Sequence, residues 1–216
     1  MTPTTRIRIV SLAAAAVLAL AAVACSDSST SNSKTGTLVL KLTDAPFPTD
    51  SVKSVDIFVV RVDGRQADAD SSAAATGAGD DSASMGGWKT LATPNQSINL
   101  LAYQGGVTFS LGSATLTAGS YAGFRLVIDP TKSSVTLSDS TVLNGNSTPG
   151  IMFPSGSRSG IKINLSQPLT VTADSTQTML IDFNVANSFV LRGNTIKQNG
   201  LLFKPVIQAT VTAGSH

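Results

Sequence analysis

The chain of 216 residues contains 15 Lys and Arg against 13 acidic side chains, and every acid is Asp. No basic cluster or stripe occurs along it, which excludes nucleic acid as a partner. The only His is the terminal His216, so a Ser-His-Asp triad, a Cys-His pair and a His-ligated metal site all lack their components. Few charges and abundant Ser, Thr and Gly favour strands and turns over helices.

Residues 1–24 are expected to be a cleaved secretory signal peptide. Arg6 and Arg8 form a short basic region, and the apolar run 9–24 is shorter than the roughly 20 residues that a membrane-spanning helix needs. The run ends in Ala-Val-Ala before Cys25, the only cysteine, and this arrangement resembles a bacterial lipobox. The resemblance implies that Cys25 is lipidated and becomes the new amino terminus. The alternative is an ordinary cysteine after an ordinary secretory cleavage site.

Anchoring at Cys25 has consequences for location and charge. Residues 25–35 then form the lipidated Cys and a flexible tether, whose ten polar residues span roughly 17 Å as a random coil. Ser26 stands where an Asp would favour the inner membrane, so an exported protein on the outer membrane is favoured if the cell has one. Removal of Arg6 and Arg8 lowers the basic count from 15 to 13, which equals the acidic count and makes the mature chain formally neutral.

The first strands of the mature chain are expected at 37–42 and 52–62. Apolar side chains occupy both sides of the second strand, which favours a central position in a sheet. Residues 63–87, almost entirely Ala, Ser, Gly and Asp, are expected to form a disordered insertion. Its five Asp residues leave open a Ca²⁺ site, although their spacing matches no EF-hand loop.

Shorter strands follow, separated by turn residues. They are expected at 88–91, 97–101, 107–111, 121–128, 134–137, 141–143, 161–165, 169–172 and 201–211. In the strand at 121–128, Ala122, Phe124, Leu126 and Ile128 alternate with the opposite set and are expected to face the core.

The strand around 178–185 has the clearest pattern in the chain. Met179, Ile181 and Phe183 share one side of it, alternating with Thr178, Leu180, Asp182 and Asn184 on the other. Many short strands between turns predict an all-β protein, in which 36–216 forms a single antiparallel β-sandwich. With no cysteine beyond the lipobox, burial alone must hold this core.

Six stretches of the mature chain share their order and spacing with one bacterial family. They are LTDAPFP at 42–48, the strand at 88–91, LTAGSYAGFRLVI at 116–128, PSGSRSGIKINL at 154–165, IDFNVANSFV at 181–190 and LLFKPVI at 201–207. On these residues the chain resembles the bacterial lipoprotein family of domain of unknown function four-three-eight-two. The resemblance implies a lipid-anchored, transthyretin-like or Ig-like, carbohydrate-binding-like β-sandwich with no assigned activity.

Aspartates in or near the expected strands are the only candidates for catalysis. Glycoside hydrolysis needs a carboxylic acid and a carboxylate on either side of the bond. Asp44, Asp56, Asp129 and Asp182 could supply such a pair. The alternative is structural: Asp44 caps the turn before the prolines, and Asp182 bonds its neighbours on the outer side of its strand. An Asp-dependent hydrolase therefore stays open as the least favoured function.

Three aromatic residues are candidates for ligand contact. Trp88, Tyr103 and Tyr121 could stack on sugar rings, although aromatic residues near strand starts also close the ends of a core. The sequence therefore predicts a lipid-anchored cell-envelope protein that is a non-enzymatic binding or structural module, with a surface glycan-binding module as the alternative. The expected partners are the membrane, through Cys25, and a glycan or envelope protein. No cofactor, metal or catalytic residue is assigned.

Overall fold

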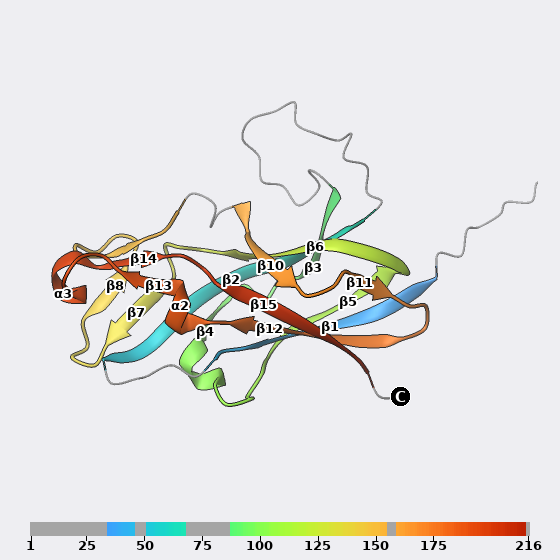
Figure 1. Ribbon diagram of the computed structural model, residues 1–216, viewed down its shortest axis with the longest axis horizontal. Coiled ribbons are helices and arrows are strands. Elements are labelled where there is room, and N and C mark those ends of the chain that lie inside the picture. The colour runs from blue at the N-terminus through green and yellow to red at the C-terminus, as the bar shows by residue number, and fades with distance from the viewer. Residues whose placement is uncertain (1–33, 46–50, 68–86, 155–158, 215–216) are drawn as a thin grey trace, which may run out of the picture. The chain divides into compact units, whose positions relative to one another are not determined.

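The computed structural model describes residues 34–45, 51–67, 87–154 and 159–214 (Figure 1). All of them belong to one compact unit, Ser33–His216. The predicted leader, Cys25 and most of the tether lie outside the described residues, as do positions 68–86 of the predicted insertion and four of its five Asp residues. The first strand begins at Thr35, so the last residue of the predicted tether already belongs to the sheet.

Twelve of the fifteen strands in the described residues form one continuous sheet that curls around a shared core. One half has the order β5 (Phe109–Thr117), β1 (Thr35–Thr43), β12 (Thr176–Phe183), β15 (Ile207–Ala213). The other half has the order β8 (Val142–Asn144), β7 (Ser134–Leu137), β2 (Val52–Gln66), β6 (Gly119–Ile128), β10 (Ile161–Leu165). Pairing of β10 with β15 joins the two halves.

Smaller elements complete the described fold (Figure 1). Beside the main path, β3 (Trp88–Ala92) and β4 (Gln96–Asn99) pair with β2, and β11 (Leu169–Val171) pairs with β6. A second sheet has the order β13 (Phe189–Leu191), β14 (Leu201–Phe203), β9 (Ile151–Met152). The helical turns are η3 (Leu100–Tyr103), α2 (Val185–Ser188) and α3 (Ile196–Asn199). None of the described helices is long and apolar enough to cross a membrane.

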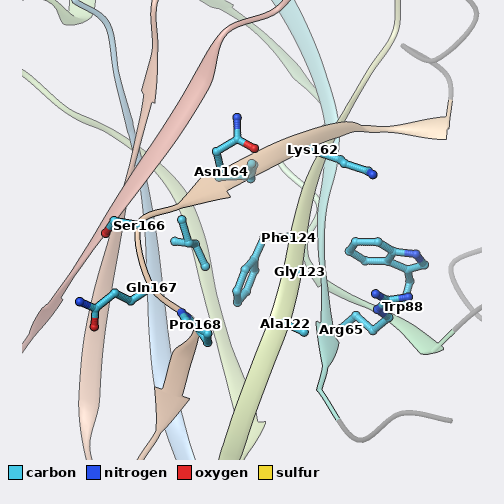
Figure 2. Close-up of a pocket in the computed structure, with 12 residues that line it drawn as sticks. Arg65, Trp88, Ala122, Gly123, Phe124, Lys162, Asn164, Ser166, Gln167 and Pro168 are labelled. Carbon is cyan, nitrogen blue, oxygen red and sulfur yellow. The ribbon is translucent and has the colours of Figure 1, made fainter. Parts of the chain in front are cut away.

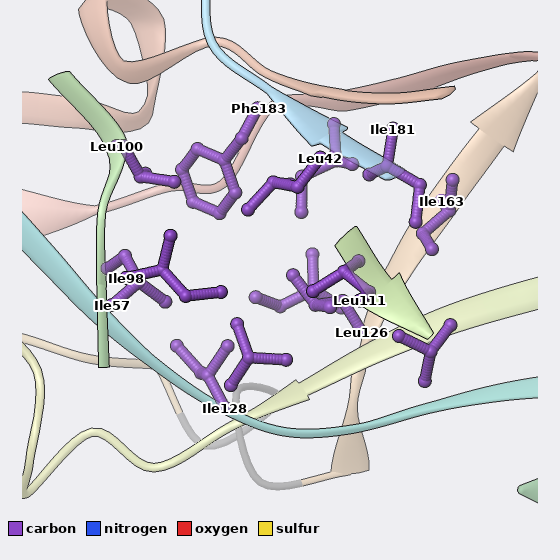
Figure 3. Close-up of a cluster of buried hydrophobic side chains, with 14 of the residues drawn as sticks. Leu42, Ile57, Ile98, Leu100, Leu111, Leu126, Ile128, Ile163, Ile181 and Phe183 are labelled. Atoms are coloured by element: carbon purple, nitrogen blue, oxygen red, sulfur yellow. The ribbon is translucent and has the colours of Figure 1, made fainter. Parts of the chain in front are cut away.

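The core lies between the two halves of the large sheet (Figure 3). Met179, Ile181 and Phe183 of β12 are fully buried, as the alternation predicted. Leu42 and Ile181 approach from one half, and Ile57 from the other (Figure 3). The predicted all-β, sandwich-like fold is therefore confirmed.

Strand direction departs from the prediction at three places. β1 pairs in parallel with β12, β10 with β15, and β14 with β9, so the expectation of a purely antiparallel sandwich was wrong for these pairs. Alternation shows which face a side chain occupies, but it carries no information on the direction of the neighbouring strand. Parallel neighbours also need long connections, and most of the domain separates β1 from β12 in the chain.

The second strand is longer than predicted. β2 runs through Gln66, so Asp63 lies inside a strand and is fully buried, whereas the sequence placed it at the start of the insertion. Polar Arg61, Asp63 and Arg65 continue the alternation on one side of β2, with buried Val62 and Gly64 between them. The Gly-rich and Asp-rich composition hid this continuation, because Gly and Asp are rare in strands.

A register shift in β6 moves one predicted core residue outwards. Gln66 pairs with Tyr121 and Arg65 pairs with Gly123, so Ala122 has no partner on β2 and forms a bulge. Ala122 is exposed and Tyr121 is buried, contrary to the predicted phase, while Phe124 faces the core as expected. The extra residue reverses the alternation between the two ends of the strand.

Phe183 should contribute strongly to stability, because its ring is fully buried and stacks on Phe203 with a centroid distance of 6.2 Å. We expect Phe183→Ala to lower the free energy of unfolding by about 3–5 kcal/mol, through lost burial and the cavity left behind. Val190→Ala, at a side chain that is 43% exposed, should change it by about 0.5 kcal/mol or less. Urea unfolding of both variants measures the two effects, and equal losses would contradict the assignment of Phe183 to the core.

Candidate functional site

A row of polar side chains crosses the outer face of β10, β6, β2 and β3. Asp63 on β2 lies opposite Arg125 on β6 and Thr90 on β3, and Arg125 lies opposite Lys162 on β10. Directly opposed residues of neighbouring strands place their side chains on the same face of a sheet. The alternate residues of these strands are apolar and belong to the core. The same alternation that fills the core therefore assembles this polar row.

Asp63 is the electrostatic centre of the row. Its carboxylate accepts hydrogen bonds from Arg61 Nε at 3.1 Å, Arg125 Nε at 2.9 Å and Thr90 Oγ1 at 3.0 Å. A fully buried charge is tolerated only when it is paired and hydrogen-bonded, and these three donors meet that requirement. Sequence reasoning missed this residue, although the alternation of Arg61, Asp63 and Arg65 was a signal that could have found it.

Two arginines pack on Trp88. The Arg125 guanidinium lies 4.6 Å from the centre of the indole ring and that of Arg65 lies 5.5 Å from it. Arg125 also donates from Nη1 to the Ser159 carbonyl oxygen at 2.8 Å. Gly123 lies beneath the indole, where an added Cβ would approach the ring to 3.3 Å. Cation–π contacts thus hold Trp88 and both guanidinium groups in place, and the ring is a wall shared with cations rather than an open stacking platform.

A pocket of about 370 Å³ opens beside Trp88 (Figure 2). Figure 2 shows Trp88, Arg65 and Lys162 on one side of it and the turn between β10 and β11 on the other, with β6 between them. The residues that line the pocket are Arg65, Trp88, Ala122, Gly123, Phe124 and Lys162 on the first side and floor, and Ile163, Asn164, Leu165, Ser166, Gln167 and Pro168 along β10 and the turn.

The charge of the pocket lining is positive. Arg65 and Lys162 are its two charged residues, and no Asp lines it. In the described part of the chain, neither side chain forms an ion pair with a carboxylate. Asp63, the carboxylate of the same face, is buried and already bonded to Arg61 and Arg125. The pocket can therefore offer two cations and the polar groups of Asn164, Ser166 and Gln167 to a small polar ligand.

The three predicted aromatic contacts do not gather at one site. Trp88 lines the pocket, but Tyr121 is only 3% exposed and donates its hydroxyl to the Thr117 carbonyl oxygen at 3.2 Å. Tyr103 is partly buried against the core and packs edge-on to Phe109 with a centroid distance of 5.3 Å. Tyr121 therefore closes the core and has no free face for a ligand, and Tyr103 lies outside the Trp88 pocket.

A family described as domain of unknown function, DUF4382, matches residues 35–205. The chain belongs to this family. The DUF4382 match begins at the first residue of β1 and includes every residue that lines the Trp88 pocket. No curated protein and no solved structure matches the chain.

The DUF4382 fold brings two of the candidate aspartates together. In the parallel pair of β1 and β12, Asp182 lies opposite Thr43, the residue before Asp44. Asp44 is 3% exposed and accepts hydrogen bonds from the Val185 backbone N–H at 3.0 Å and from Gln104 Nε2 at 3.1 Å. Asp44 therefore ties the end of β1 to the start of α2, a structural role close to the turn cap that the sequence suggested.

Burial dominates the electrostatics of this DUF4382 aspartate pair. It raises the pKa of Asp44 to about 6, and the charge of Asp182 adds to the rise, while the hydrogen bonds from Val185 and Gln104 oppose it. Burial also raises the pKa of Asp182, whose Oδ1 has no hydrogen-bond partner among the described residues. The prediction that Asp182 bonds its neighbours on the outer side of its strand was therefore wrong for this oxygen.

The other two candidate aspartates of the DUF4382 domain have local partners. Asp56 accepts from Ser54 Oγ at 2.7 Å, and Asp129 accepts from Thr131 Oγ1 at 2.6 Å. Hydrogen bonding by Thr131 lowers the pKa of Asp129. Within the described ranges, no three His, Cys, Asp or Glu side chains are grouped closely enough to hold a metal ion.

Stability should depend on pH through Asp44. Its pKa is near 3.8 when unfolded and about 6 when folded, so between these values the folded chain keeps a proton that the unfolded chain has released. The free energy of unfolding should therefore fall as pH rises through this window and level off above it. Asp44→Asn removes this titration, so urea unfolding from pH 4 to 7 should show a smaller fall in the variant. Equal pH dependence of the two proteins would contradict the buried, protonated state of Asp44.

Proposed function

We propose that this DUF4382 chain is a lipid-anchored cell-envelope protein that binds a ligand without catalysis. The lipobox-like run that ends at Cys25 supports export and anchoring, and Ser26 after it supports the outer membrane. Stable anchoring needs more than one acyl chain, at about 0.8 kcal/mol per buried CH₂, so the modification at Cys25 would have to carry two or more. The tether that follows would place the domain at a short distance from the membrane surface.

The observation that carries the binding function is the pocket beside Trp88. Concave sites with a few fixed polar groups are the usual binding sites of proteins. Here Arg65 is held over an indole ring, and Lys162 projects from the neighbouring strand β10, so the polar groups come from strands rather than from flexible segments. Asp-dependent hydrolysis has much less support, because Asp44 is buried and its carboxylate is occupied by Val185 and Gln104.

A glycan is the ligand class that the pocket favours. Sugar rings present many hydroxyl groups, which require closely spaced hydrogen-bond donors and acceptors. Trp88 and Arg65 supply one wall, and Asn164, Ser166 and Gln167 add hydrogen-bonding groups to the lining. This arrangement supports the glycan-binding module more strongly than a purely structural role.

Anchoring should depend on one sulfur atom. We expect Cys25→Ser to leave an untrimmed precursor that incorporates no fatty acid, because serine lacks the thiolate that accepts the diacylglycerol. Metabolic labelling with a radioactive fatty acid, followed by mass analysis of the purified protein, tests this. Labelled and correctly trimmed protein from the variant would rule out the lipid anchor at this position.

Glycan binding should depend on Trp88 and not on Tyr103. We expect Trp88→Ala to lower retention on a glycan array by about tenfold or more, because it removes one wall of the pocket and frees Arg65. Tyr103→Phe, which keeps the ring packed on Phe109, should bind as the parent does. A glycan that binds both variants equally well would place the binding site elsewhere on the domain.

A further inference from the structure

We infer that the ligand of the Trp88 pocket is an acidic saccharide, whose carboxylate is held between Arg65 and Lys162. This inference rests on the proposed glycan-binding function and specifies its substrate class. It commits the pocket to a sugar that carries a carboxylate, of the uronic-acid type, rather than to a neutral sugar. Charge, preorganisation of Arg65 and the chemistry of the polar wall support it in turn.

The first support is the charge of the pocket. Arg65 and Lys162 both line it, and no acidic side chain does. The nearby carboxylate of Asp63 has no exposed surface and already accepts from Arg61 and Arg125. In the described residues neither cation has an ion-pair partner, so a bound anion could pair with both.

The second support is the position of the Arg65 guanidinium. It packs over Trp88 at 5.5 Å from the ring centre, so it is held in place before a ligand arrives. A planar guanidinium can donate two parallel hydrogen bonds to one carboxylate, a geometry that an ammonium group cannot provide. A side chain that is already ordered loses less entropy on binding. Arg65 is therefore suited to a planar, bidentate anion, and Lys162 adds a second positive charge.

The third support is the polar wall formed by β10 and the turn that follows it. Asn164 continues β10 two residues beyond Lys162 on the same face, and Ser166 and Gln167 follow in the turn (Figure 2). Amide and hydroxyl groups both donate and accept hydrogen bonds, which suits the hydroxyl groups of a sugar. The floor of the pocket includes Ala122 and Gly123. A simple inorganic anion would leave this wall and most of the volume of about 370 Å³ unused.

Calorimetric titration of the detergent-solubilised full chain tests the inference. The probes are digalacturonate, its neutral counterpart digalactose, and inorganic phosphate. We expect digalacturonate to bind about tenfold or more tightly than digalactose, because digalactose cannot form the charge-assisted hydrogen bonds. This difference in affinity should become smaller at high salt, which screens the charges. Phosphate should bind more weakly than digalacturonate.

Three variants assign the effect to the cations. Lys162→Ala and Arg65→Gln should each remove most of the preference for digalacturonate. Urea unfolding of Lys162→Ala, at an exposed side chain, should match that of the parent protein, so a general defect in folding is separated from the loss of charge. The matched control Lys204→Ala removes an exposed lysine outside the pocket and should keep the full preference.

Each remaining outcome overturns a different statement. Equal binding of digalacturonate and digalactose by the parent protein would overturn the acidic saccharide and leave glycan binding intact. Phosphate that binds as tightly as digalacturonate would show that no sugar is recognised, and an unchanged preference in Lys162→Ala and Arg65→Gln would show that these cations do not hold the carboxylate. Binding of neither saccharide would overturn both the inference and the glycan-binding function on which it rests.

Discussion

The register of β2 against β6 is the constraint on which both faces of the described domain depend. A shift of one residue in a strand exchanges its two faces, so the pairing of Asp63 with Arg125 fixes the core and the outer surface together. In this register Val62 and Leu126 face the core, while Asp63 and Arg125 meet on the outside. Three donors surround the buried carboxylate of Asp63. A shift in register would leave this charge buried and unpaired, so any other register has a higher free energy.

The same register also determines the chemistry of the outer face. Asp63 forms ion pairs with Arg61 and Arg125, so its negative charge stabilises the sheet. Arg65, two residues further along β2, packs on Trp88 and lines the pocket. One face thus contains a structural ion-pair cluster and a cationic pocket side by side, and Trp88 contacts an arginine from each.

The sequence predicted those features that depend on local pattern. The period-two alternation around Met179, Ile181 and Phe183 identified a strand and its buried face correctly, because burial of alternate side chains needs no knowledge of the partner strand. The parallel partner of that strand could not be predicted, since β1 and β12 lie far apart in the chain. The proximity of Asp44 and Asp182 follows from this pairing, so it could not be predicted from the sequence either.

The candidate site was only partly predictable. Trp88 was found from residue type alone, but Tyr121 was assigned to the same role and is a core residue whose hydroxyl bonds to Thr117. An aromatic side chain can pack in a core or contact a ligand, so residue type alone does not distinguish these two roles. Arg65 and Lys162 were missed because their neighbourhood arises only when β2, β3, β6 and β10 pair.

The position of β15 has a consequence for the order in which the domain can form. This strand, the last of the described chain, lies between β12 and β10 and joins the two halves of the large sheet. Until Ile207–Ala213 is available, β12 has one unpaired edge and β10 has another, both facing the place where the halves must close. Closure of the sandwich is therefore a late event that waits for the carboxyl-terminal strand. A chain that emerges amino terminus first therefore keeps both strand edges unpaired until this strand has arrived.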